Sequence, residues 1–216
     1  MAIDLDTLWV YRIIPIENLE FTLQNGLYAK KEEVIDPNYI AIGSKEVISR
    51  RDSAIVKCYP ETVVNDYVPF YFSVRTPMLY NIHTGVGVLQ YPQENIIYLC
   101  YKFKDLACDN FQWCYTNGNA ASAITKFFND SQEIDIKVDW RSITTTDFRD
   151  DNADGDEDRV RKKHAEFLVK KHVPASHLQS IVVKNDKKGK EVEGILTKLG
   201  IKIGLHINPN NQFYFL

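Results

Sequence analysis

One carboxylate in this sequence stands where a polar group is unexpected. Glu166 begins the apolar run 166–169, EFLV, which has the composition of a half-buried β-strand. An ionised carboxylate in such a place is costly unless a positive group pairs with it. It is either a functional carboxylate or an edge residue that faces solvent or pairs with Arg161 or Lys163. The residues alone favour the second interpretation, because paired structural carboxylates are common.

Three stretches combine charged, amide and aromatic side chains in a way that indicates a common site. They are YRII at 11–14, followed by NL at 18–19 and NGL at 25–27; Arg51, with DYVPFYF at 66–72 and RTPMLY at 75–80; and KKHAEFLV at 162–169. Alternation along a strand lets only one parity of the aromatic run face a ligand. We expect Tyr71 to face the ligand, and Phe70 and Phe72 to face the core.

An acidic segment precedes the third stretch. Residues 147–158, DFRDDNADGDED, hold seven carboxylates, and the spacing from Asp150 matches the start of a calcium-binding loop. The match fails further along, because the twelfth position, where a bidentate Glu is needed, is Arg161. We therefore expect a solvated loop and no metal site.

The charge of the chain is distributed unevenly. The net charge is −3, but residues 159–204 hold 12 Lys and Arg against 4 Asp and Glu, a local balance of +8, which leaves −11 for the remainder. Such asymmetry is typical of a surface that binds a phosphate backbone. Taken alone, the charge pattern favours the simpler explanation, a lysine-rich solvated surface.

Length and composition favour one domain. A chain of 216 residues with 44% hydrophobic side chains buries roughly 70% of its unfolded surface. Its four cysteines show no C-x-x-C spacing, which is typical of reduced thiols in a cytoplasmic protein. No apolar stretch reaches the ~20 residues of a membrane span, and no signal peptide is evident.

Strand and helix patterns are interspersed without a regular βαβ alternation, which favours an α+β fold. Pro69 places its strand at an edge or a bulge, and Gly26 and Gly200 end helices. We expect strands at 8–14, 67–74, 95–101, 166–169 and 180–183, helices at 17–25, 43–56, 120–128 and 192–199, and a closing strand pair at 204–207 and 212–215.

The motifs DYVPFYFSVRTPMLY, KKHAEFLV and YRIIPIENLEFTLQNGL together resemble the DarT family of DNA ADP-ribosyltransferase toxins. The resemblance extends from Tyr11 to about Val183. It implies a single ADP-ribosyltransferase domain over residues 1–216, with a split, strongly bent β core, peripheral helices, and NAD in a cleft between the two halves.

The resemblance also implies the roles of individual residues. Glu166 matches the catalytic glutamate and Arg51 the catalytic arginine. Residues implied in binding NAD are Arg12, Ile13, Ile14, Phe21, Ala29, Arg51 and Tyr71. Residues implied in binding single-stranded DNA are Arg75, Thr76, Pro77, Met78, Leu79, Tyr80, Arg161, Lys162, Lys163 and His164, with Trp140 and Phe148 as further candidates for stacking on bases.

The activity implied is the transfer of one ADP-ribose from NAD to thymine or guanine in single-stranded DNA, without a metal or a membrane. Such toxins are accompanied by an antitoxin that removes ADP-ribose, often through a macrodomain. Arg12 departs from the family, which has His there; an arginine suits a ribose hydroxyl or the pyrophosphate. Alternatives are a transferase that modifies RNA or protein, and a non-catalytic binder of single strands.

Overall fold

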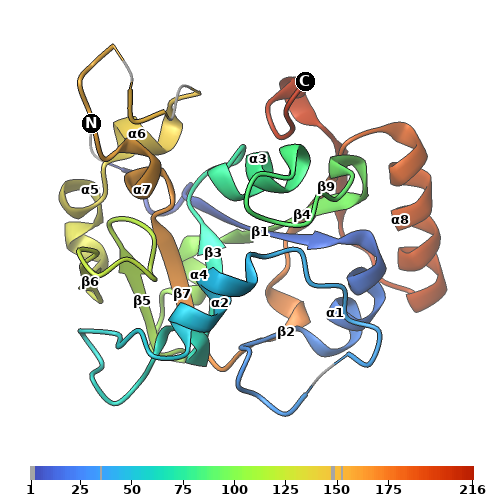
Figure 1. The fold of residues 1–216 in the computed structure, drawn as a ribbon. Coiled ribbons are helices and arrows are strands. Elements are labelled where there is room, and N and C mark those ends of the chain that lie inside the picture. The colour runs from blue at the N-terminus through green and yellow to red at the C-terminus, as the bar shows by residue number, and fades with distance from the viewer. Residues whose placement is uncertain (1–2, 35, 147–148, 152) are drawn as a thin grey trace.

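A computed structural model describes residues 3–34, 36–146, 149–151 and 153–216. Eight strands form one mixed sheet in the order β10-β9-β4-β1-β3-β7-β5-β6, and β2 and β8 form a separate pair (Figure 1). The strands are β1 (Trp9–Pro15), β2 (Leu27–Tyr28), β3 (Tyr67–Tyr71), β4 (Ile96–Lys102), β5 (Trp113–Thr116), β6 (Phe127–Phe128), β7 (Glu166–Lys170), β8 (His172–Val173), β9 (Ser180–Val183) and β10 (Gly204–Ile207).

Helices lie on both faces of this sheet. They are α1 (Leu19–Asn25), α2 (Lys45–Arg51), α3 (Pro77–Thr84), α4 (Phe103–Leu106), α5 (Ile134–Lys137), α6 (Trp140–Thr144), α7 (Arg159–Lys163) and α8 (Asp186–Leu199). Short 3₁₀ turns connect several of the elements. None of the helices in the described ranges is long and apolar enough to cross a membrane.

The sheet is nearly divided between β1 and β3. These strands pair at one position only, Tyr11 opposite Tyr71, whereas β1 pairs with β4 along its whole length. Pro69 explains the gap. Its carbonyl accepts a hydrogen bond from Arg12 on β1, so its nitrogen, which has no hydrogen, also faces β1. The expectation that Pro69 places its strand at an edge or a bulge is wrong, because β3 lies inside the sheet, between β1 and β7. The proline is tolerated there because β1 pairs with β3 at one position only.

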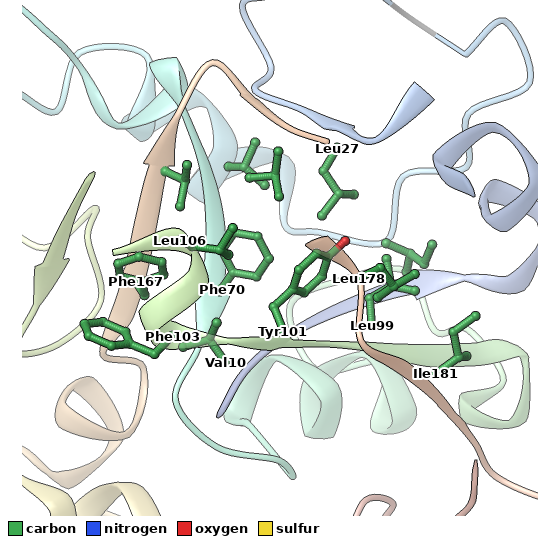
Figure 2. Packing of buried hydrophobic residues seen from close by; sticks show 14 of the residues in the cluster. Val10, Leu27, Phe70, Leu99, Tyr101, Phe103, Leu106, Phe167, Leu178 and Ile181 are labelled. Atoms are coloured by element: carbon green, nitrogen blue, oxygen red, sulfur yellow. The ribbon is translucent and has the colours of Figure 1, made fainter. Parts of the chain in front are cut away.

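The two faces of the sheet carry different cores. One face has a continuous cluster that runs from Ile181 on β9 through Leu99, Tyr101 and Phe70 to Phe167 on β7 (Figure 2). On the other face the apolar side chains form two separate clusters, one centred on β1 and β4 and one on β5 and β7. The strand registers place Tyr11, Tyr71 and Glu166 in a row between those two clusters.

Two expected elements are wrong. Residues 120–128 form turns and the short strand β6 instead of a helix, because tertiary contacts hold their backbone: Lys57 binds the carbonyls of Ala123 and Thr125. Residues 212–215 are not a strand, and β10 pairs in parallel with β9. The Arg75 and Gln93 side chains bind the backbone of this last segment, at Tyr214 and Phe215, in place of a strand partner.

The other differences are in the extents of elements and in elements that were missed. Helix α2 is confined to Lys45–Arg51, with Ser44 as its N-cap, and α8 begins at Asp186, before the expected residue 192. Strand β5 and helix α3 were not predicted. Helix α3 has a clear local signal, because Thr76 caps it and Pro77 stands at its first position.

Candidate active site

A buried ion pair joins the two residues expected to be catalytic. Glu166 begins β7 and Arg51 ends α2; they are 2% and 9% exposed. Nη1 and Nη2 of Arg51 donate to Oε1 and Oε2 of Glu166 at 3.3 and 2.9 Å. The bidentate geometry is the strong form of this pair and keeps the carboxylate fixed. The partner of Glu166 is thus a distant arginine and not Arg161 or Lys163, the expected local ones.

Two further groups from the end of β5 hold Glu166. The backbone N–H of Ala120 donates to Oε1 at 3.0 Å, and the backbone N–H of Glu166 donates to Oγ1 of Thr116 at 2.9 Å. Oε2 accepts from Arg51 alone among the described residues. One carboxylate oxygen therefore keeps lone pairs for a ligand.

Tyr71 and His164 flank the carboxylate. Tyr71 is the register partner of Glu166, its hydroxyl donates to Sδ of Met78 at 3.1 Å, and its ring is 6.4 Å from that of His164. Burial and the Glu166 charge raise the pKa of the Tyr71 phenol. Burial lowers the pKa of His164. Both rings are thus neutral at pH 7, and Phe70 and Phe72 belong to the core, as expected.

Arg12 lies where the pairing of β1 and β3 stops. Nη1 donates to the Pro69 carbonyl at 3.3 Å, and strand alternation places its side chain on the face of Tyr101. Nε of Arg12 and the hydroxyl of Tyr101 are buried, and neither has a hydrogen-bond partner in the described parts of the chain. Buried polar atoms are normally satisfied, so two such atoms at the split are notable.

The other residues implied in binding NAD are spread around this point. Ile13 and Ile14 point to opposite faces of the sheet, and each is 3% exposed. Phe21 is half-buried on α1, and Ala29 is buried just after β2. Contact between NAD and β1 would therefore involve backbone as well as side chains.

Asn18 holds the segment that joins β2 to α2, a structural role that the sequence did not indicate. Its buried side chain donates to the carbonyl of Ile40 at 2.9 Å and accepts from the Ile40 N–H at 3.0 Å. Because Arg51 ends α2, this double hydrogen bond helps to place the arginine that was expected to be catalytic.

We expect Asn18→Ala to lower the free energy of unfolding by about 1–3 kcal/mol, because it leaves both Ile40 backbone groups without a partner. Protease cleavage near Ile40 should become faster. Denaturant unfolding and limited proteolysis measure the two effects. Asn129→Ala, at an exposed amide that binds Tyr59, should change neither.

Most side chains of the motif at 75–80 are buried or bound within the protein, so they stabilise the fold and do not face a ligand. Thr76 and Leu79 are fully buried, and Thr76 accepts from the Leu79 N–H as the cap of α3. Arg75 has a left-handed backbone, with φ of 50°, and its guanidinium donates to the carbonyls of Tyr214 and Asn211. Pro77 is buried as well, which leaves Met78, half-buried, and Tyr80, 40% exposed, to present side chains to a ligand.

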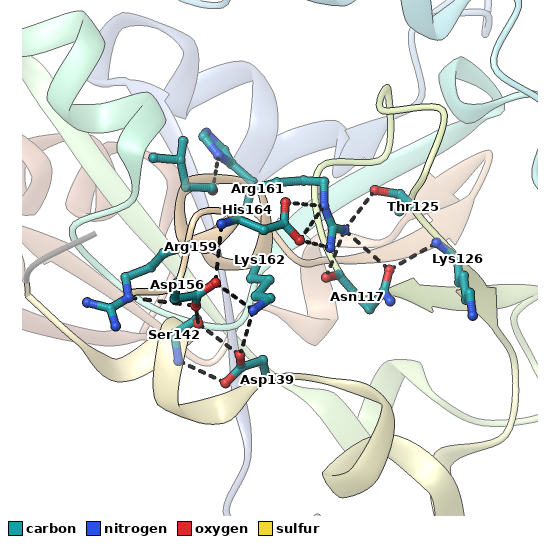
Figure 3. A network of polar contacts seen from close by, with 12 residues as sticks. Asn117, Thr125, Lys126, Asp139, Ser142, Asp156, Arg159, Arg161, Lys162 and His164 are labelled. Carbon is teal, nitrogen blue, oxygen red and sulfur yellow. Dashed lines mark hydrogen bonds and ion pairs between the residues drawn. The ribbon is translucent and has the colours of Figure 1, made fainter. Parts of the chain in front are cut away.

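The basic stretch 161–164 is engaged within the protein (Figure 3). Arg161 pairs with Asp158, and Lys162 pairs with Asp156 at 2.8 Å. Nζ of Lys163 donates to two backbone carbonyls, and Nδ1 of His164 lies 2.9 Å from the carbonyl oxygen of Val160. The acidic segment thus pairs with two of the side chains that were expected to meet phosphates, Arg161 and Lys162. Its carboxylates bind cations of the chain itself and form no metal-ligand group among the described residues.

Lys163 gives a pH-dependent prediction. Burial lowers its pKa from 10.5 to about 8, so between these values the unfolded chain binds a proton that the folded chain does not. The free energy of unfolding should therefore rise with pH over this window, relative to Lys163→Met, by about 3 kcal/mol. Denaturant unfolding of both proteins at pH 7 and 10.5 measures the difference. A constant difference would show that the carbonyls of Ile143 and Thr145 keep the ammonium charged.

Of the two remaining candidates for base stacking, the structure describes only Trp140, which does not line the site. Trp140 packs edge-on against Phe72, at 5.5 Å, and donates to the Ile134 carbonyl. Phe148 lies outside the described residues. Cavities of about 390 and 480 Å³ are lined by residues around Lys171 and around Tyr91, away from Glu166.

Comparison with known proteins agrees with this geometry. A family model described as ssDNA thymidine ADP-ribosyltransferase, DarT, matches residues 11–215. The chain belongs to the DarT family. A curated DNA ADP-ribosyl transferase of Thermus sp. (strain 2.9) is 34% identical over 188 residues, which are 87% of this chain and 86% of that protein.

Two solved structures of DarT proteins share the fold. Thermus sp. 2.9 DarT in complex with ADP-ribosylated ssDNA superposes with a TM-score of 0.85 at 28% identity, over 96% of both chains. The same protein in complex with NAD+ gives 0.79 at 27% identity, over 96% of this chain and 98% of that one. The expected α+β architecture of the DarT family is confirmed.

The DarT site contains groups that no sequence pattern singled out. The Ala120 N–H reaches Glu166 from a turn that was expected to be helical, and the Thr116 hydroxyl reaches it from β5, which was not predicted. Asn18 lies in the first of the three stretches that were expected to form a common site, but nothing in the sequence pointed to its partner Ile40. A local pattern carries no signal for contacts of this kind.

Proposed function

We propose that this protein transfers ADP-ribose from NAD to a thymine base of single-stranded DNA. The observation that carries the proposal is the buried, bidentate pair of Glu166 and Arg51, beside the row of side chains at the sheet split. Membership of the DarT family supports the acceptor, since the family description names thymidine in ssDNA. The complexes of Thermus sp. 2.9 DarT with NAD+ and with ADP-ribosylated ssDNA support both substrates.

Two orphaned polar atoms fit a dinucleotide at the split. Nε of Arg12 and the hydroxyl of Tyr101 are buried and have no hydrogen-bond partner among the described residues. Oxygens of NAD would provide these partners. An arginine binds a pyrophosphate well, because its planar donors match phosphate oxygens. Arg12 thus binds the pyrophosphate or a ribose hydroxyl, with Tyr71, Phe21, Ala29 and the backbone of 13–14 around it.

Glu166 acts on the reacting sugar. The bond from ribose C1′ to the nicotinamide nitrogen breaks, nicotinamide leaves with the electron pair, and C1′ bonds to a base nitrogen that loses its proton. The transition state resembles an oxocarbenium ion, and a fixed carboxylate beside it is worth roughly 3–4 kcal/mol. Oε2, which accepts only one hydrogen bond in the described structure, holds the ribose 2′-hydroxyl or takes the proton from the base.

Arg51 keeps this carboxylate charged and oriented. Both of its terminal nitrogens bind Glu166, which favours this role over a clamp on the NAD phosphates. A buried carboxylate without a cation would be an uncompensated charge, which is costly, and its orientation would not be fixed. Arg51 therefore serves catalysis through Glu166.

The acceptor strand approaches along the start of α3. Tyr80 is exposed and Met78 is half-buried next to Tyr71, so both can contact an unstacked base. Arg75 contributes through the surface that it builds with Asn211 and Tyr214. Lys162, Lys163 and His164 contribute less, because their polar atoms are engaged.

We further propose that the protein is a cytoplasmic toxin paired with an antitoxin that removes ADP-ribose through a macrodomain. The DarT family resemblance supports this, and covalent modification of bases would stop replication. Expression of the wild type should arrest growth, and a DNA ADP-ribosyl hydrolase of the macrodomain type should restore it. Arrest by a Glu166→Gln variant would contradict the toxin proposal.

Labelled NAD and four single-stranded oligonucleotides, each lacking one base, test the activity. We expect label on every oligonucleotide except the one without thymine, and none with Glu166→Gln. If the oligonucleotide without guanine stayed unlabelled instead, the modified base would be guanine and not thymine. Label that appeared only on RNA or on protein would show that the acceptor is not DNA. If the wild type and Glu166→Gln both bound DNA and neither transferred label, the protein would be a non-catalytic binder of single strands.

A further inference from the structure

We propose that Arg161, held by Asp158, is a positioning residue that fixes Glu166 through the turn 117–120, and that it does not contact the acceptor strand. This inference rests on the proposed role of Glu166. It assigns a function to the acidic segment that precedes α7, and it replaces the DNA-binding role that the family resemblance implied for Arg161.

The guanidinium of Arg161 is fully engaged (Figure 3). Nε donates to both carboxylate oxygens of Asp158, at 2.7 and 3.0 Å, and Nη2 pairs with the same carboxylate. Nη1 donates to the carbonyl and side-chain oxygens of Asn117, at 3.2 and 3.5 Å, and to Oγ1 of Thr125 at 3.3 Å. A planar fork with this many partners is a rigid connection between α7 and the segment 117–125.

Gly118 lets the two segments approach each other closely. A Cβ atom there would overlap Nη1 of Arg161 and would lie 3.0 Å from the Arg161 carbonyl oxygen. The same carbonyl accepts the N–H of Asn119 at 3.0 Å. Arg161 therefore binds the turn from both its side chain and its backbone, and the absence of a side chain at Gly118 permits both contacts.

The turn passes this constraint on to the carboxylate. Oγ1 of Thr116 donates to the Gly118 carbonyl at 2.7 Å and accepts the N–H of Glu166 at 2.9 Å. Two residues after Gly118, the N–H of Ala120 donates to Oε1 of Glu166 at 3.0 Å. Thr116 is fully buried and Ala120 is 2% exposed, so the path from Arg161 to Glu166 runs through close-packed groups that transmit displacement.

The acidic segment supplies the opposite charge for this arrangement. Asp158 binds Arg161, Asp156 binds Lys162, and Asp154 binds Arg159 at 2.5 Å. Arg159 and Arg161 have side chains that are 5% and 17% exposed, so unpaired cations at these positions would be costly. The segment thus makes it possible for a basic helix to pack next to the active site.

Arg161→Ala, Arg161→Lys and Asp158→Asn test the proposal, with Arg141→Ala as the matched control. Arg141 pairs with Asp154 of the same segment, but its side chain is 76% exposed and lies on α6 instead of against the turn. We expect kcat for nicotinamide release without DNA to fall roughly 10- to 100-fold in the first three variants. KM for NAD should change little. Arg161→Lys should not restore kcat, and Arg141→Ala should resemble the wild type.

Binding of single-stranded DNA without NAD gives the second readout. If Arg161 positions Glu166, affinity and its dependence on salt stay at wild-type values. If Arg161 binds a phosphate, the slope of log K against log salt falls by about 0.7, nicotinamide release stays normal, and the proposal is overturned. Equal losses of kcat in Arg141→Ala would overturn it as well.

Amide hydrogen exchange of Ala120 tests the proposal independently of activity. Its protection should fall in Arg161→Ala and Asp158→Asn, and not in Arg141→Ala. Unchanged protection would refute the path through the turn even if the wild type proved inactive, in which case the proposed function fails separately. Should Arg161→Ala not fold, Gly118→Ala, which displaces an intact Arg161, should reproduce the loss of kcat and of protection.

Discussion

Replacement of Glu166 by Gln should lower both transfer to DNA and nicotinamide release without DNA by roughly 10²- to 10³-fold. Gln has nearly the same shape and can still accept the Ala120 N–H, so the change removes mainly the negative charge. Without it, nothing at this position in β7 stabilises the positive charge that develops on the ribose. Rates of nicotinamide release and of label transfer at saturating NAD measure the effect.

The fold should survive this substitution. The neutral amide of Glu166→Gln would leave Arg51, 9% exposed, without its counter-charge, which should cost about 1–3 kcal/mol of unfolding free energy. Glu20→Gln is the matched control, since Glu20 pairs with Lys198 at the surface and should be silent in both assays. Retention of transfer within threefold by Glu166→Gln would show that the carboxylate is structural, which was the more conservative interpretation of the sequence.

The partner of this carboxylate shows where sequence reasoning ended. The position of Glu166 at the start of an apolar strand was correctly judged unusual, and the strand itself is present as β7. The cations near it in sequence were the natural partners to consider. The actual partner, Arg51, is 115 residues away, and only the antiparallel pairing of β3 and β7 and the placement of α2 bring it near. Periodicity describes one element at a time and contains no such information.

The segment 117–128 shows tertiary contacts that override local preference. AASAI at 120–124 has the composition of a helix, but Lys57, Arg161 and Glu166 bind its backbone or its neighbours in a non-helical form. Intrinsic helix preference is worth only about a few tenths of a kcal/mol per residue, less than one buried charge-assisted hydrogen bond. Whenever several such bonds converge on one segment, a propensity-based expectation fails.

The uneven charge along the sequence does not produce an equally uneven surface. Treating 147–158 and 159–204 as separate patches led to the expectation of a positive surface. In the fold the two meet, and Asp154, Asp158 and Asp156 pair with Arg159, Arg161 and Lys162 of α7. Sequence totals cannot show which charges cancel across a turn, because opposite charges cancel only within a few ångströms of each other. Pro69 shows a similar limit: its missing N–H correctly indicated a break in strand pairing, but the strand that carries it lies inside the sheet and not at an edge.

Arg51→Ala should be the most destructive single substitution in the protein, because it affects stability and catalysis together. It leaves Glu166, 2% exposed, as an uncompensated buried charge, which should cost about 3–5 kcal/mol of unfolding free energy. The carboxylate would also lose the two hydrogen bonds that orient it, so transfer should fall roughly 10²-fold or more even where the variant is folded. Denaturant unfolding and nicotinamide release measure the two losses, and Arg50→Ala, at the adjacent exposed position, should show neither.

Arg51→Lys and a double variant separate charge from geometry. Lys restores the positive charge but cannot reproduce the two parallel hydrogen bonds, so it should recover much of the stability and little of the activity. Arg51→Met combined with Glu166→Gln removes both charges and should be more stable than Arg51→Met alone, with a coupling energy of about 1 kcal/mol or more. Additive effects, or a fully active Arg51→Lys, would mean that the pair is not the unit that holds the carboxylate proposed to be catalytic. A coupled pair with an inactive lysine variant would show that orientation of Glu166, beyond its charge, is what Arg51 provides.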